Sequence, residues 1–171
     1  MVPMRWSAPS KGWIKINVDV AFKKNGDASL GVVIRDDAGK VLLSAWRVVA
    51  NASNAEEVEI LACKEGLTLT VEWTPCQTTL ESDCSSGIKY LSDLGEQRTP
   101  SAFVIREAKK LASTLPGIVF KHVRRKQNYV AHELLAQLAS RLFHSAVWRN
   151  RYPVCVEPLV VQDCNSALSN L

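Results

Sequence analysis

The sequence lacks the features that mark most cofactor-dependent, secreted and membrane proteins. Its five cysteines form no CxxC pair, and they make no zinc-spaced cluster with the three histidines. It has no GxGxxG, P-loop or GxSxG segment to support dinucleotide binding, P-loop chemistry or serine hydrolysis. No run approaches about 18 apolar residues, and the first residues contain no apolar signal-peptide core. We therefore expect a soluble, intracellular protein with reduced thiols, in the nucleus or the cytoplasm.

The composition is that of one globular domain. The chain has 171 residues and 47% of them are hydrophobic, which is enough apolar material for one core. The net charge of +4 is too small to indicate a nucleic-acid partner by itself. We expect a polar lead-in over residues 1–12, a domain over 13–148 and a loosely packed C-terminal tail over 149–171.

The pattern of apolar residues predicts an α/β protein with the order βββαβααβα. A buried strand over 13–22 is followed by a hairpin over 30–46, whose turn is Asp36–Gly39. A polar break at 51–54 precedes a long helix that ends before Pro75. The other predicted elements are a strand over 77–83, helices over 85–95 and 101–115, a strand over 117–123 and a helix over 128–148. This order predicts a five-stranded mixed sheet flanked by helices.

Three carboxylates lie where such a sheet can bring them together. Asp19 ends the first apolar strand, Glu59 lies in the first turns of the long helix, and Asp83 ends another strand. At one edge of a sheet they would form a site for two divalent cations. Taken singly, Asp19 could be a turn or cap residue, Glu59 part of a solvated acidic face, and Asp83 a helix cap. A shared site accounts for all three.

The ordered segments resemble the plant ribonuclease H-like domain of the ribonuclease H type 1 family, which occurs in non-LTR retroelement polyproteins. The similar segments are RWSAPSKGWIKINVD, GVVIRDDAGKVLLSAW, AEEVEILACKEGL, LESDCSSGI and FKHVRRKQNYVAHELLAQLA. The resemblance implies a ribonuclease H-like fold and a monomer, with no membrane association. It also implies that the chain is part of a reverse-transcriptase polyprotein or derived from one.

This resemblance implies hydrolysis of the RNA strand of RNA–DNA hybrids with two Mg²⁺ ions, or Mn²⁺ instead. Asp19 would bridge both ions, Glu59 would hold the substrate-side ion and contact a ribose hydroxyl, and Asp83 would complete that side. His132 occupies the place of the family's fourth carboxylate, and we count it among the catalytic and metal-binding residues. The alternative is a half-exposed helix histidine that binds nothing.

A second departure from the family is Val20, where a glycine usually follows the first aspartate. A valine there is expected to crowd a nucleic-acid backbone that approaches the strand. Because of Val20 and His132, a catalytically silent nucleic-acid-binding module of retroelement origin is the alternative function.

A dense positive run precedes the last predicted helix. We expect it to bind phosphates of an RNA–DNA hybrid or another nucleic acid, although an ordinary solvated loop is the alternative. The nucleic-acid-binding residues that we predict are Lys121, Arg124, Arg125, Lys126 and Asn128.

Overall fold

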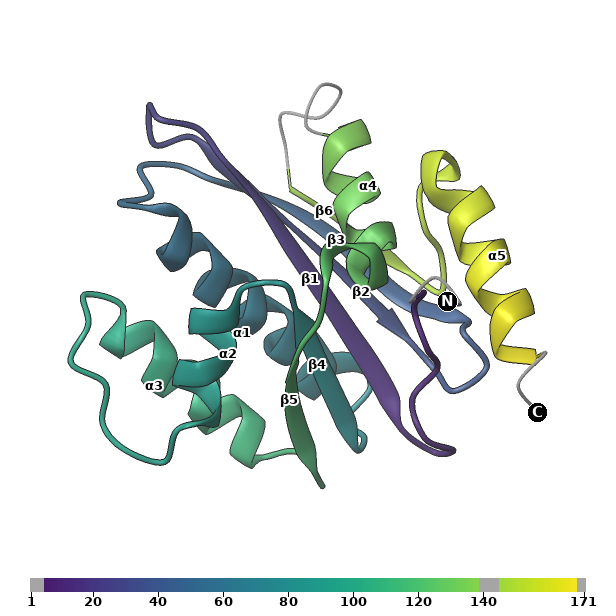
Figure 1. Cartoon of the computed structure of the whole chain (residues 1–171), viewed down its shortest axis with the longest axis horizontal. Coiled ribbons are helices and arrows are strands. Elements are labelled where there is room, and N and C mark those ends of the chain that lie inside the picture. Colours follow the sequence, from purple (N-terminus) through teal and green to yellow (C-terminus); the bar gives the residue numbers. More distant parts are fainter. Residues whose placement is uncertain (1–4, 139–144, 169–171) are drawn as a thin grey trace.

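The computed structural model describes residues 5–138 and 145–168, and these form a mixed sheet with helices on both faces (Figure 1). Within these residues, six strands follow the order β5-β4-β1-β2-β3-β6. The β1–β4 and β4–β5 pairs are parallel and the others antiparallel. The strands are β1 (Ile14–Phe22), β2 (Ala28–Arg35), β3 (Val41–Val49), β4 (Thr78–Ser82), β5 (Ile118–His122) and β6 (Ala146–Arg149). The predicted class is confirmed, with a sixth strand.

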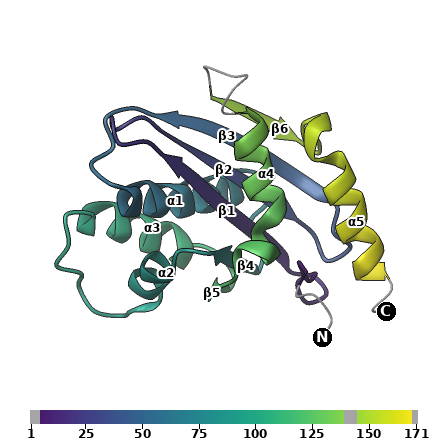
Figure 2. The same cartoon turned by 45° about the horizontal axis from the view of Figure 1, so that its top comes forward.

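The helices divide between the two faces of the sheet. Figures 1 and 2 show α1, α2 and α3 on one side of the sheet, and α4 and α5 on the other. The α-helices are α1 (Ala55–Trp73), α2 (Ser85–Ser92), α3 (Ala102–Ser113), α4 (Tyr129–Leu138) and α5 (Glu157–Leu168). Two short 3₁₀ turns are η1 (Arg125–Asn128) and η2 (Val154–Val156). No helix in the described part of the chain has the length and apolar character needed to cross a membrane.

The sixth strand replaces the end of the helix predicted over 128–148. Helix α4 is described as far as Leu138, and residues 139–144 lie outside the described part of the chain. Beyond them, β6 pairs antiparallel with β3. The apolar pattern of its four residues is compatible with either structure, and the pairing that decides it comes from a distant strand.

Helix α1 packs tightly against β1 through a glycine. Its first turn is capped by Asn54, whose side-chain oxygen accepts a hydrogen bond from the Glu57 amide at 2.9 Å. Further along, a Cβ placed on Gly66 would lie only 2.7 Å from Cγ2 of Ile16 in the sheet. Glycine is therefore what lets the helix come this close to β1, and this helix carries Glu59.

The C-terminal segment is not the loosely packed tail that the sequence predicts. It forms η2 and α5, and buries Val156 and Val160 in a second apolar cluster with residues of β2, β3 and α4. Arg35, only 1% exposed, donates a hydrogen bond of 2.7 Å to Asp163 on α5. That charge pair and the apolar cluster together fix α5 to the sheet.

The lead-in is also anchored, by a buried polar network under α5. The Trp6 ring lies 3.8 Å from the Arg35 guanidinium carbon, and its indole nitrogen donates to Asn17 at 3.0 Å. Asn17 in turn donates to Glu81, which pairs with Lys15 at 2.8 Å. Buried charges are stable only when they are paired in this way. The network lies on the β1 face that also bears Asp19, because residues of a strand alternate between its faces.

Candidate metal centre

Asp19 and Asp83 lie close together at the point where the pairing of β1 with β4 ends. These parallel strands pair from Ile14 with Thr78 as far as Asn17 with Glu81. The same offset, continued by two residues, places Asp19 opposite Asp83 at the open edge. Asp83 follows β4 directly, one residue beyond the end of the strand that the sequence predicts to include it. Asp19 does not end its strand, however, because β1 continues to Phe22 through its pairing with β2.

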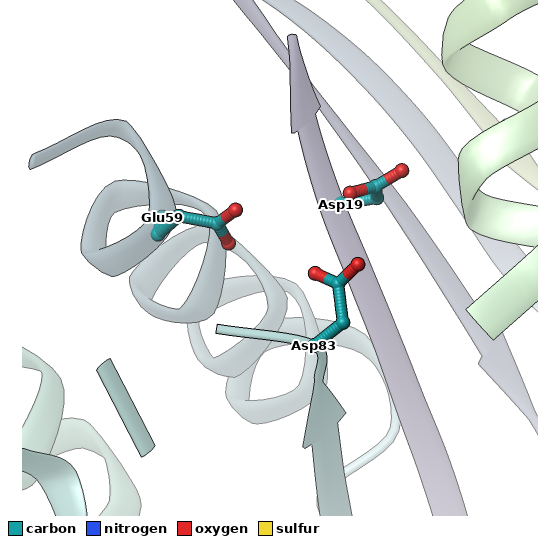
Figure 3. A group of neighbouring side chains, drawn as sticks. All are labelled: Asp19, Glu59 and Asp83. Carbon is teal, nitrogen blue, oxygen red and sulfur yellow. The ribbon is translucent and has the colours of Figure 1, made fainter. Parts of the chain in front are cut away.

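The third carboxylate comes from the helix on the other face of the sheet. Glu59 is half-buried between the fully buried Val58 and Ile60, at the margin of the packing face of α1 as expected. Figure 3 shows Glu59 and Asp83 turned toward the edge where Asp19 lies. One oxygen from each of the three carboxylates lies within 4.8 Å of the others. The convergence inferred from chain order is therefore present.

Burial and nearby negative charge disfavour the charged forms of Glu59 and Asp19. Burial raises the pKa of Glu59 to about 8, with further increases from Asp83 and Asp19. Burial also raises the pKa of Asp19, whereas the hydrogen bond to His132 acts in the opposite direction and lowers it. Glu59 Oε2 is buried and has no hydrogen-bond partner among the described residues. Three converging carboxylates supply the hard oxygen ligands that a divalent cation such as Mg²⁺ or Mn²⁺ prefers.

His132 contacts the centre through one carboxylate. Its Nδ1 lies 2.7 Å from Oδ2 of Asp19, and 36% of its side chain is exposed. Direct coordination of metal by His132 stays a prediction, since the mutually close ligand atoms are those of the three carboxylates. The alternative of a half-exposed helix histidine that binds no metal therefore stays a prediction as well, although the ring contacts Asp19.

Val20 lies on the other face of the sheet from Asp19. It is partly buried and packs against the apolar cluster shared with α1. The side chain follows Asp19 in β1, and successive residues of a strand point to opposite faces. Val20 therefore contributes to the core beneath the centre rather than standing beside Asp19.

Four of the five predicted basic or polar residues are exposed, and Arg125 among them reaches the metal centre. Lys121 lies in β5, and Arg124, Arg125 and Lys126 are exposed at or near η1. Arg125 is the nearest, with Nε 3.5 Å from Oδ2 of Asp83. His122, at the end of β5, also touches the centre, with its Nε2 3.2 Å from the Asp83 carbonyl.

The exception is Asn128, which is 1% exposed. Its side-chain amide donates to the carbonyl of Val18 at 2.5 Å, tying η1 to β1 next to Asp19. Its role as a nucleic-acid contact is corrected to a structural one, because the folded chain covers it. Sequence reasoning also missed Tyr129, whose ring centroid lies 6.4 Å from that of His132. Their three-residue spacing on a helix is the signal that would have linked them.

A mixed sheet of this order, with helices on both faces and acidic residues at the β1–β4 edge, defines a ribonuclease H-like protein. The profile of the reverse transcriptase-like family matches residues 17–139, and the chain belongs to that family. Among curated proteins, no sequence matches this chain.

Solved structures of ribonucleases H share the fold at low sequence identity. The N-terminal RNase H domain of a Mycobacterium tuberculosis protein is 18% identical, with a TM-score of 0.65 over 94% of this chain and 99% of that one. RNase H1 of Halobacterium salinarum is 21% identical, with a TM-score of 0.65 over 71% and 92%. LC11-RNase H1, solved in complex with an RNA/DNA hybrid, is 21% identical, with a TM-score of 0.57 over 70% and 91%.

Proposed function

We propose that this protein is a metal-dependent endonuclease that hydrolyses the RNA strand of RNA–DNA hybrids. The observation that carries the proposal is the convergence of Asp19, Glu59 and Asp83 within 4.8 Å, on a fold shared with ribonucleases H. Three carboxylates that converge in this way form a cation site rather than a set of independent caps.

Asp19, Glu59 and Asp83 would hold two Mg²⁺ ions, with Mn²⁺ as a substitute. Such ions supply an activated water and stabilise the oxygen that leaves the phosphate. His132 holds one oxygen of Asp19 and so sets the orientation of that carboxylate. The partly exposed Glu59 faces the open edge, where a ribose hydroxyl of the substrate strand would be bound.

The basic residues around the centre support a nucleic-acid substrate. Lys121 is exposed in β5, and Arg124, Arg125 and Lys126 are exposed at or near η1, where Arg125 lies 3.5 Å from Asp83. Lysine and arginine bind phosphates without reading sequence, so little sequence preference is expected. The hybrid bound by LC11-RNase H1 supports the choice of an RNA–DNA hybrid. The family match supports an origin in a reverse-transcriptase polyprotein.

The test is cleavage of a hybrid labelled on its RNA strand, with Mg²⁺ and then Mn²⁺. The wild type is expected to cut the RNA strand, and Asp19→Asn is expected to abolish cutting without changing the thermal melt. An Asp19→Asn protein that cuts as fast as the wild type would show that the activity does not come from this centre.

The second candidate is a silent binding module with the same fold. Two contacts favour it, because Asp19 Oδ2 is engaged by His132 and Asp83 Oδ2 by Arg125. Each contact occupies one of the two oxygens that the carboxylate can offer to a cation. A folded protein that binds the hybrid but cuts it with neither metal would establish this candidate instead. Restoration of cutting by His132→Asp would then identify the histidine as the cause.

A further inference from the structure

A groove opens beside the metal centre, between the lead-in, the first turn of α4 and helix α5. It has a volume of about 260 Å³, and its polar lining includes Arg5, Lys126, Tyr129, Gln162 and Asp163. A second hollow of about 350 Å³ shares Arg5 and Gln162 with it and runs on along α5. The two together form an elongated surface depression, which suits a chain-like ligand better than a compact one.

A single stretch of chain lines both the groove and the metal centre. Arg125 lies 3.5 Å from Asp83 of the centre, whereas the next residue, Lys126, lines the groove. One turn later Tyr129 lines the groove, and its ring lies 6.4 Å from that of His132, which is bonded to Asp19. The groove is therefore separated from the carboxylates by about the width of one side chain.

The groove carries positive charge and an exposed aromatic ring. Arg5 and Lys126 contribute the charge, while the one carboxylate in the lining, that of Asp163, is already paired with the buried Arg35 at 2.7 Å. Tyr129 is 47% exposed although it is a large aromatic residue. Cations for phosphates beside an aromatic face for a base are the features that bind single strands and strand ends.

We propose that this groove binds nucleotides of the strand that continues past the carboxylates. Tyr129 stacks on one base, and Arg5 and Lys126 contact the phosphates on either side of it. The inference rests on the proposed function in one respect, since the bound nucleic acid must also lie at the metal centre.

The stacking is tested by binding of a labelled RNA–DNA hybrid with a single-stranded extension, with Ca²⁺ replacing Mg²⁺ so that binding is measured without cleavage. Tyr129→Leu is expected to weaken binding about 5- to 100-fold, because loss of base–aromatic stacking has an effect of that size. Tyr129→Phe keeps the ring and is expected to bind within twofold of the wild type. Phe103→Leu is the matched control, since Phe103 is an exposed aromatic on α3, across the sheet.

The phosphate contacts are tested through the salt dependence of binding. Changing Arg5 and Lys126 together to Gln is expected to reduce the slope of log affinity against log salt concentration by about 2. The matched control is Arg106→Gln with Lys110→Gln, which removes the same charges from the exposed surface of α3.

Binding of Tyr129→Leu within twofold of the wild type, with an unchanged salt slope in the Arg5 and Lys126 variant, overturns the inference. A wild type that binds no hybrid overturns it as well. A wild type that does not cleave, yet binds through Tyr129, overturns the proposed hydrolysis alone. If Tyr129→Leu melts early, Tyr129→Phe and the charge variants still decide the outcome.

Discussion

At the scale of single residues, Glu59 is the carboxylate whose charged form a bound cation is expected to stabilise most. Burial raises its pKa to about 8, and the charges of Asp83 and Asp19 act in the same direction. Its Oε2 is buried without a hydrogen-bond partner among residues 5–138 and 145–168. Below pH 8 the metal-free fold therefore holds a proton on Glu59, and a bound cation must displace it.

This competition predicts that the affinity for Mg²⁺ increases with pH. Between pH 6 and pH 8, one released proton corresponds to a gain of up to about tenfold per pH unit. Isothermal titration calorimetry at pH 6, 7 and 8, in buffers of different ionisation enthalpy, measures both the affinity and the number of protons released.

Glu59→Gln is the control for that measurement, since it removes the titrating group and keeps the shape. Its affinity for Mg²⁺ is expected to be lower and its dependence on pH flatter than in the wild type. An equal pH dependence in both proteins would mean that Glu59 is not the group that exchanges its proton for the cation.

The sequence alone was sufficient to predict the role of residues whose role follows from their position in a strand or helix. Asp19, Glu59 and Asp83 could be placed together because the alignment of two neighbouring strands and the margin of a helix face fix their positions. Asn128 and Tyr129 could not be placed, because each role depends on what the folded chain puts beside it. The side chain of Asn128 donates a hydrogen bond to a buried carbonyl of β1, and Tyr129 lines a groove that α5 completes.

At the scale of elements, the contact between α1 and β1 sets the position of Glu59. A Cβ on Gly66 would lie 2.7 Å from Cγ2 of Ile16, a fully buried side chain with no room to move. Gly66→Ala is expected to lower the free energy of unfolding by about 1–2 kcal/mol, because overpacking outweighs the gain in helix propensity. Urea denaturation at constant m-value measures the change.

Gly87 in α2 gives the opposite expectation for the same substitution. A Cβ there would make only an ordinary contact of 3.5 Å with Sγ of Cys84. Gly87→Ala is therefore expected to raise the free energy of unfolding by about 0.5–1 kcal/mol. If both variants raise the free energy of unfolding, helix propensity and not the approach of α1 to β1 decides the effect.

Elements determined by local chemistry were predictable, and those determined by distant contacts were not. The β2–β3 turn is local, since an Asp36 side-chain oxygen accepts from the amides of Ala38 and Lys40, and Gly39 has a φ of 83°. Strand β6 and helix α5 depend instead on β3 and on the second apolar cluster. Their sequences show no sustained period, so the contacts that fix them are tertiary.

At the scale of the whole molecule, both ends of the chain close the face that bears Asp19. The family match spans residues 17–139, yet Trp6 and α5 lie outside that span. Helix α5 completes the second apolar cluster, and the Trp6 ring lies over Arg35. The connection between α5 and the sheet is the Arg35–Asp163 pair, whose arginine is 1% exposed. Removal of one partner from a buried pair leaves an uncompensated charge in the core.

Asp163→Ala is therefore expected to lower the free energy of unfolding by ~3–5 kcal/mol, measured by urea denaturation. Glu107→Ala is the comparison, since it breaks the exposed pair with Lys64 and is expected to cost less than ~1 kcal/mol. Replacing both buried partners, with Arg35→Met and Asp163→Leu, removes the stranded charge and is expected to recover most of the loss. A cost for Asp163→Ala no larger than that for Glu107→Ala would mean that the buried pair contributes no more to stability than a pair at the surface, and that the apolar cluster around Val156 and Val160 alone holds α5 to the sheet.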